Sequence, residues 1–262
     1  MAHSLFSMAN TQFRAALFDF DETMVDLEWE HDAAHRALCR DLGCDYERLP
    51  ESFRFGSGRR IVDDIAEMRE FFGWSESPEE LWGIRHRHFL EALGGVASRD
   101  DEKAAEDEQK TAEYDQKAAG GVAGATQNRI ELMPGVERVV RELHGLGVTL
   151  AITTSAAGDA VDLLLRRFGI RELFALIVDG SEVAHGKPDP AGYLLTATKL
   201  GVAPPDCVVF EDSHVGVLAA KAAGMICVAV RNPRARIHQD LSAADLVLDF
   251  FNDLSVDGLR GR

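Results

Sequence analysis

Short apolar runs alternate with longer segments of helical periodicity from Met133 to the end of the chain. The apolar runs predict strands at 148–155, 174–180, 207–213, 226–230 and 245–249. The segments between them predict helices at 133–147, 158–169, 189–201 and 215–224. Strands that alternate with helices in this way indicate right-handed crossovers and a mostly parallel sheet.

One more strand is predicted near the N-terminus, at the start of the stretch LFDFDETMVD, residues 17–26. The region that follows it offers no partner strand, so this strand must join the same sheet. The pattern therefore predicts an α/β fold with a Rossmann-like, mostly parallel sheet as its core.

The region between these two parts predicts helices alone, at 29–43, 56–74 and 77–93. Gly43 ends the first of them, and Ser77, Pro78 and Glu80 suit the cap and first turn of the third. We therefore expect an all-helical cap domain inserted into the α/β core. The core is predicted to contain residues 1–27 and 131–262, and the cap residues 28–130.

Residues 99–128 are rich in Asp, Glu, Lys, Ala and Gly and nearly lack large apolar side chains. Such a segment contributes little to a hydrophobic core. It is typical of a solvated helix followed by a flexible, glycine-rich loop. An acidic arm that binds a partner is the alternative.

The composition is that of a globular protein, with 46% hydrophobic and 27% charged residues among 262. No apolar run approaches the roughly 18–20 residues that span a bilayer, and no secretion signal precedes the first strand. We therefore expect a cytoplasmic protein without a membrane partner. The net charge of −16 argues against nucleic acid as a partner. A monomer or a weak homodimer is expected.

Polar side chains follow several of the predicted strands. In an open parallel sheet, ligands bind outside the carboxyl ends of the strands. The side chains at that edge are Asp19, Asp21, Thr154, Ser155, Lys187, Glu211 and Asp212. Four neighbouring carboxylates need a cation, and their oxygen ligands suit Mg²⁺.

These residue types suit phosphoryl transfer. An aspartate oxygen can attack phosphorus to give an acyl-phosphate, and a second aspartate can protonate the leaving oxygen and then activate water. Hydroxyl and ammonium groups would hold the phosphoryl oxygens. A small phosphorylated metabolite is therefore compatible with the acidic net charge, because a metal and one or two cations can hold it locally.

Four motifs in this order resemble the haloacid dehalogenase superfamily, and within it the beta-phosphoglucomutase-like phosphatases that have a helical cap. They are Asp19-Phe20-Asp21-Glu22-Thr23, Thr154 at the end of TLAIT, Lys187 in GKPDP, and Glu211-Asp212-Ser213. The resemblance covers the chain apart from its first dozen residues and the acidic segment.

The resemblance implies a role for each motif residue. Asp19 would be the nucleophile and Asp21 the general acid/base, and Thr154, Ser155 and Lys187 would bind the phosphoryl group. The implied Mg²⁺ ligands are Asp19, the backbone carbonyl of Asp21, Asp212 and, directly or through water, Glu211. Relatives commonly have Gly where this chain has Glu22. A residue with a side chain fits this position if its backbone dihedral angles are ordinary, but an extra acid near an anion could weaken phosphate binding.

Two cap residues, His31 and Arg59, match positions that face the active site in the mutase-like relatives. Arg59 would bind a distal phosphate or a sugar hydroxyl through its planar guanidinium. His31 and His35 have the i, i+4 spacing of a zinc site, but no third ligand accompanies them. A role at the surface or the hinge is the other interpretation of this pair.

The resulting hypothesis is a Mg²⁺-dependent phosphatase that hydrolyses a small phosphorylated metabolite, in particular a sugar phosphate, through an aspartyl-phosphate. A phosphomutase that uses the same intermediate is the nearest alternative, suggested by His31 and Arg59. A catalytically weak binding or regulatory protein is the third, suggested by Glu22 and the acidic segment.

Overall fold

The computed structural model describes residues 13–50, 58–94 and 130–256, except 234 and 236. The acidic segment 99–128 lies outside the described residues, so its predicted helix and loop stay predictions. None of the helices in the described parts of the chain is long and apolar enough to cross a membrane.

Six parallel strands form the single sheet of the described residues, in the order β3-β2-β1-β4-β5-β6. Their bounds are β1 Ala15–Phe18, β2 Thr149–Thr153, β3 Phe174–Val178, β4 Cys207–Glu211, β5 Ile226–Val230 and β6 Leu246–Leu248. The predicted parallel α/β sheet is confirmed. The N-terminal strand β1 lies at its centre, between β2 and β4, as its lack of a local partner requires.

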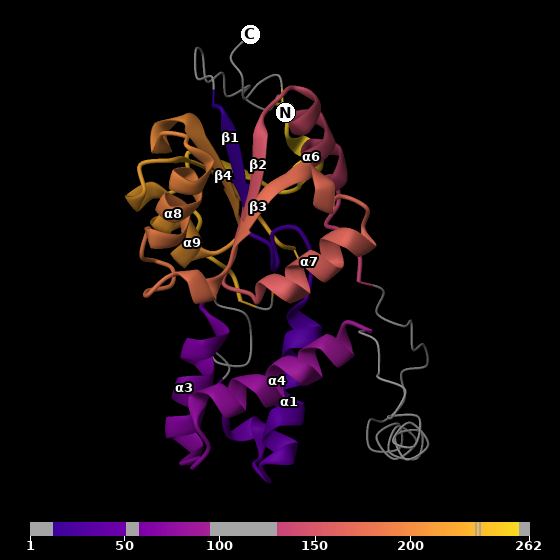
Figure 1. Cartoon of the computed structure of the whole chain (residues 1–262), viewed down its shortest axis with the longest axis vertical. Coiled ribbons are helices and arrows are strands. Elements are labelled where there is room, and N and C mark those ends of the chain that lie inside the picture. The colour runs from indigo at the N-terminus through magenta and orange to yellow at the C-terminus, as the bar shows by residue number, and fades with distance from the viewer. Residues whose placement is uncertain (1–12, 51–57, 95–129, 234, 236, 257–262) are drawn as a thin grey trace.

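Helices cover both faces of this sheet, with α6 and α7 on one side and α8 and α9 on the other (Figure 1). The four helices are α6 Val136–Gly145, α7 Gly158–Arg167, α8 Ala191–Leu200 and α9 His214–Ala222. Successive side chains of a strand point to opposite faces. Phe18 accordingly packs with α6 and α7, whereas Leu17 packs with α8 and α9.

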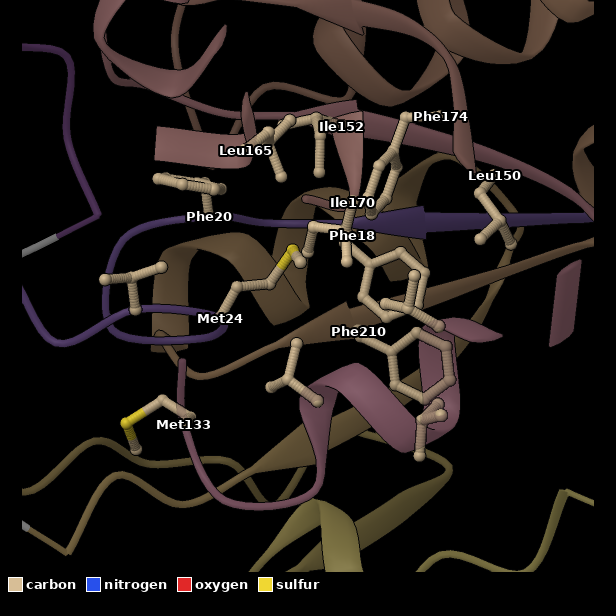
Figure 2. Packing of buried hydrophobic residues seen from close by; sticks show 14 of the residues in the cluster. Phe18, Phe20, Met24, Met133, Leu150, Ile152, Leu165, Ile170, Phe174 and Phe210 are labelled. Atoms are coloured by element: carbon tan, nitrogen blue, oxygen red, sulfur yellow. The ribbon is translucent and has the colours of Figure 1, made fainter. Parts of the chain in front are cut away.

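The larger core cluster is centred on Phe18, whose ring stacks on Phe210 of β4 with centroids 4.6 Å apart. Figure 2 shows Ile152, Phe174 and Met24 gathered around these rings. Packing of this kind fixes the ends of β1 and β4 side by side. The residues that follow Phe18 and Phe210 are therefore held next to each other.

The helices described between β1 and α6 pack together as a separate layer at the end of the sheet (Figure 1). Within residues 28–50 and 58–94 they are α1 Glu28–Asp41, α3 Ile61–Phe72 and α4 Pro78–Ala92. Ser77 and Glu80 form the predicted capping box at the start of α4, with the Ser77 side chain accepting from the Glu80 amide. These helices enclose their own small core, which includes Leu38, Ile65 and Leu81. The domain limits at residues 28 and 130 stay a prediction.

Candidate active site

Asp19 lies at the carboxyl end of β1, where its amide donates to the carbonyl of Phe210 on β4 at 3.0 Å. Lys187, from the loop before α8, contacts Asp19 Oδ1 and Glu211 Oε1 at 2.5 Å each. The ammonium and both carboxylates are almost completely buried. Three of the predicted site residues thus meet at one point, although they come from three distant parts of the chain.

Glu211 and Asp212 follow each other at the end of β4 but have different partners. Both oxygens of Glu211 are engaged, Oε1 by Lys187 and Tyr193 and Oε2 by the amides of Asp212 and Ser213 and by the Ser213 hydroxyl. Asp212 accepts at Oδ1 from the Thr23 hydroxyl at 2.7 Å. Among the described residues, no donor contacts its Oδ2. Asp212 is therefore the acid of this pair with an oxygen available for a ligand.

The electrostatics of this cluster are dominated by burial. Desolvation raises the pKa of Asp19, which Glu211 reinforces and Lys187 opposes. Desolvation likewise raises the pKa of Asp212, with Glu211 and Asp19 adding to it. Burial would also raise the pKa of Glu211, but Lys187 and the hydrogen bonds from Lys187, Ser213 and Tyr193 outweigh it and lower the pKa. The single charge of Lys187 thus balances one carboxylate of the three.

The donor set of this cluster fits a hard divalent cation. Oxygens of Asp19, Glu211 and Asp212 all lie within 4.8 Å of one another. The ligand atoms are oxygens only, as Mg²⁺ prefers, and two further positive charges would permit all three acids to ionise. The acidic cluster is thus suited to a metal ion of this class.

Thr154 and Ser155 follow β2 on the other side of Asp19. The Thr154 side chain accepts from the Ala156 amide at 3.1 Å, and the Ser155 hydroxyl donates to the carbonyl of Gly58 at 2.9 Å. Both residues line one small cavity together with Lys187. The structure therefore brings together the predicted phosphoryl-binding side chains, and Ser155 also joins the core to the segment that enters α3.

Asp21 is held by the cap rather than by the core. His31 Nε2, in α1, lies 2.9 Å from Asp21 Oδ2, and Arg85, in α4, contacts His31 Nδ1 at 2.5 Å. Desolvation lowers the pKa of His31, with Arg85 acting in the same direction and Asp21 against it. Because a guanidinium only donates, Nδ1 of the neutral ring accepts and Nε2–H donates to Asp21. His35 is buried next to this chain of bonds, and its pKa is lowered by desolvation.

Glu22 occupies the turn after Asp21 with a φ of +63°, in the left-handed region where glycine costs least. Its carboxylate accepts from the Leu27 amide at 3.0 Å and from the side chain of Asn232. Desolvation raises the pKa of Glu22 to about 8, with Asp26 and Asp21 contributing. The φ angle of Glu22 is thus not an ordinary one for a residue with a side chain. Its carboxylate holds the segment that leads into α1 of the cap through the Leu27 amide.

The two arginines that precede α3 have different surroundings. Arg59 forms ion pairs with Asp64 and Glu67 on α3. Arg60 instead reaches the core, where it donates to the carbonyl of Val183 at 2.9 Å and lines the cavity of Thr154 and Lys187. Arg60 thus lies next to the predicted phosphoryl-binding side chains, and the substrate-binding role of Arg59 stays a prediction.

Three residues that contact the site were not predicted from the sequence: Arg60, Arg85 and Tyr193. For Arg85 a signal was present, because it lies midway between Leu81 and Phe89 at i±4 spacing on the apolar face of α4, and all three are buried. A charged residue on a buried helical stripe needs a polar partner. Tyr193 donates to Glu211 from the first turns of α8, and nothing in its sequence context indicates this.

Comparison with known proteins identifies one protein family and several similar enzymes that act on phosphorylated sugars. The sequence model of the haloacid dehalogenase-like hydrolases matches residues 13–224. The fructose-1-phosphate phosphatase YqaB of Escherichia coli is 30% identical over 221 residues, 84% of this chain and 97% of that protein. The beta-phosphoglucomutase of Bacillus subtilis is 26% identical over 254 residues, 94% of each chain.

Among solved structures, CbbY from Rhodobacter sphaeroides in complex with phosphate superimposes with a TM-score of 0.71 and 26% identity. The match covers 94% of this chain and 99% of that one. The similarity thus includes both the sheet and the helical layer.

Proposed function

Because the chain belongs to the haloacid dehalogenase-like hydrolase family, we propose that it is a Mg²⁺-dependent phosphatase that hydrolyses a small sugar phosphate. The family predicted from the four motifs is thereby confirmed. The proposal itself depends on one observation, the buried cluster of Asp19, Glu211 and Asp212 around Lys187 at the ends of β1 and β4.

In the first half of the proposed reaction, an Asp19 oxygen attacks the phosphorus and the ester P–O bond breaks. Asp21 gives its proton to the leaving oxygen, so that the alcohol departs neutral. Asp19 then carries the phosphoryl group as an aspartyl-phosphate. Lys187, Thr154 and Ser155 hold the phosphoryl oxygens, and the Lys187 ammonium offsets the charge that develops on them.

In the second half, water attacks the phosphorus and the bond to Asp19 breaks. Asp21, now ionised, takes a proton from this water, and inorganic phosphate leaves. The His31 bond to Asp21 keeps this carboxylate directed at the reacting atoms. Both steps then use one side chain for proton transfer, and the nucleophile is regenerated.

Asp19, Asp212 and the backbone carbonyl of Asp21 would hold the Mg²⁺, with Glu211 contributing through water because its own oxygens are occupied. When bound, the ion neutralises charge on the phosphoryl group and on the acids. Thr23 orients Asp212 for this purpose through its hydroxyl.

Phosphate release from a panel of sugar phosphates, with and without EDTA, tests this proposal. We expect EDTA to abolish release, added Mg²⁺ to restore it, and Asp19→Asn to eliminate it. Asp162→Asn, on the surface of α7, is the matched control and should retain full activity. Release that persists in Asp19→Asn, or that EDTA does not affect, would exclude the mechanism.

A phosphomutase is the second candidate, favoured by the contact of His31 with Asp21. A mutase must also bind the phosphate that does not react. Arg59, the residue expected to do so, is engaged by Asp64 and Glu67, and this favours hydrolysis. Incubation with β-glucose 1-phosphate and a bisphosphate primer decides between them. Glucose 6-phosphate would support the mutase, and free phosphate alone would exclude it.

We also propose that the enzyme acts in the cytoplasm as a monomer or weak homodimer, with residues 28–130 as its cap domain. Sedimentation across a range of concentrations tests the assembly state. Fractionation of the native cells tests the compartment.

A further inference from the structure

A second, larger cleft opens between the cap and the core, beside the cavity of Thr154 and Lys187. Its volume is about 580 Å³, within the range of roughly 300–1,000 Å³ for small-molecule sites. Ser155, Arg60, Asp179 and Gly180 line both spaces. The cleft therefore adjoins the cavity of the proposed phosphoryl-binding residues and offers room for the organic part of a substrate.

The wall of this cleft is largely apolar and includes an aromatic platform. Trp82 and His86 of α4 stack with ring centroids 4.5 Å apart at 15°. His86 is held in turn by Asp159 at the start of α7, at 2.8 Å. Both rings line the cleft, and Trp82 is half-buried. The platform is thus fixed in place before any ligand binds, which limits the entropy lost on binding.

Other apolar side chains complete this wall: Ile61, Val62, Pro78, Phe89, Ala156 and Ala157. Val62 is 43% exposed although it is aliphatic and lies in a concave site. A wall of this kind fits a flat, poorly hydrated group better than the hydroxyls of a simple sugar.

The charges in the cleft disfavour a second phosphate. Arg60 is paired with Asp63 through two hydrogen bonds, and Arg85 contacts His31. The acids Glu79, Asp159 and Asp179 line the same space. Among the described lining residues, the two arginines are therefore already engaged, and the three acids add negative charge to the same space.

From these observations we infer that the substrate is a phosphorylated sugar with a planar aromatic ring, as in a nucleoside 5′-monophosphate, and that the ring stacks against Trp82. This inference rests on the proposed phosphatase function and narrows its substrate class. In this arrangement the phosphate lies at Lys187 and Thr154, and the sugar lies beside Ser155. The aromatic ring then lies in the cleft.

The test compares sugar phosphates that carry an aromatic base with one that lacks it. The kcat/KM for uridine and adenosine 5′-monophosphate is measured against that for ribose 5-phosphate, which has the same phosphorylated sugar without the ring. Stacking of a base on an aromatic side chain predicts a preference of about ten- to hundredfold for the ring-bearing probes. Equal kcat/KM values would overturn the inference and leave the phosphatase proposal intact.

Two variants locate the preference. Trp82→Leu keeps an apolar side chain but removes the aromatic face, and Val62→Lys adds a charge at an exposed position of the wall, where folding is least affected. Trp82→Leu should reduce the preference for the ring about tenfold or more, and Val62→Lys should reduce it because it places a charge in the apolar wall. Phe71→Leu removes an exposed aromatic ring of α3 outside the cleft lining, and should leave the preference unchanged. A preference that survives both cleft variants would contradict the inference.

Binding to Asp19→Asn, measured by calorimetry with uridine 5′-monophosphate and ribose 5-phosphate, separates this inference from the proposed function. Tighter binding of the ring-bearing probe without phosphate release by the wild type would retain the ring site and exclude the phosphatase. Equal affinity, or failure to bind either probe, would overturn the ring site.

Discussion

His31 Nε2 lies 2.9 Å from Asp21 Oδ2, and this bond joins the first turn of the cap to the proposed acid/base. Removing the donor in His31→Ala leaves Asp21 without its positioning partner. We expect kcat to fall by about ten- to hundredfold, with KM changed much less, in steady-state phosphate release. His31→Gln keeps a side-chain N–H and should recover part of the loss.

Arg85 should act through His31, because it contacts the ring nitrogen opposite Asp21. Arg85→Met is therefore expected to lower kcat alone but to add little in combination with His31→Ala. His88→Gln is the control, since His88 of α4 contacts Asp41 of α1 and Glu91 of its own helix, away from Asp21. Additive losses from His31→Ala and Arg85→Met would show that the two residues act independently.

Gly216 allows Glu211 to occupy its position behind Lys187. A Cβ at Gly216 would lie 1.8 Å from Oε1 of Glu211, so Gly216→Ala must displace this carboxylate. Since a shift of about 1 Å in a site can cost about hundredfold in rate, we expect a loss of that order in kcat/KM. Gly83→Ala, where a Cβ meets nothing within 4 Å, should leave kcat/KM unchanged and stabilise α4 slightly.

The shorter acid in Glu211→Asp provides a further check on this clash. If steric displacement is the cause, Gly216→Ala should reduce kcat/KM less in the Glu211→Asp background than in the wild type. An equal reduction in both backgrounds would point to another effect of the methyl group on α9.

The sequence predicted the sheet and the motif residues because both have local signals. Apolar runs identify β1 and β4, and Asp19 and Glu211 follow or end those runs directly. The cap residues have no such signal. Arg59 and Arg60 are neighbours in sequence, and their different surroundings depend on how α3 begins relative to the loop of Val183 and Gly186.

The contacts between cap and core depend on tertiary packing, which no local pattern records. His31 has the helical spacing to His35 that a zinc site requires, yet its contacts are Asp21 and Arg85, from elsewhere in the chain. The conformation of Glu22 was equally inaccessible, because a positive φ at an acid is visible only in the backbone.

The backbone conformation of Glu22 determines which of two variants, Glu22→Gly or Glu22→Ala, should be the more stable. At ordinary dihedral angles, Ala is more favourable than Gly by roughly 0.5–1 kcal/mol. At a φ of +63° the order should reverse, so that Glu22→Gly unfolds with a free energy about 1 kcal/mol higher than Glu22→Ala. Urea denaturation of both variants measures this difference. A more stable Glu22→Ala would contradict the left-handed conformation.

A variant at Glu22 also tests the alternative that the protein is a catalytically weak binding or regulatory protein. The Glu22 carboxylate is directed to the Leu27 amide and to Asn232, and we therefore expect Glu22→Gly to change KM by less than about threefold. A large decrease in KM would instead mean that the acid repels the substrate phosphate.

The burial of Asp64 in the cap should make the free energy of unfolding depend on pH. Its side chain is 15% exposed, and desolvation raises its pKa from the ordinary 3.8 to about 6, against the opposing effect of Arg59. The folded protein therefore binds this proton more tightly than the unfolded chain does. The resulting stabilisation is complete below about pH 4 and is lost as the pH rises through about 6.

Asp64→Asn lacks this loss, so its stability relative to wild type should increase by about 1–2 kcal/mol from pH 4.5 to 8. Urea denaturation at both pH values measures the change, and Glu70→Gln, an exposed acid on the same helix, should show none. A relative stability of Asp64→Asn that is constant or falls with pH would mean that the pairing with Arg59 outweighs burial.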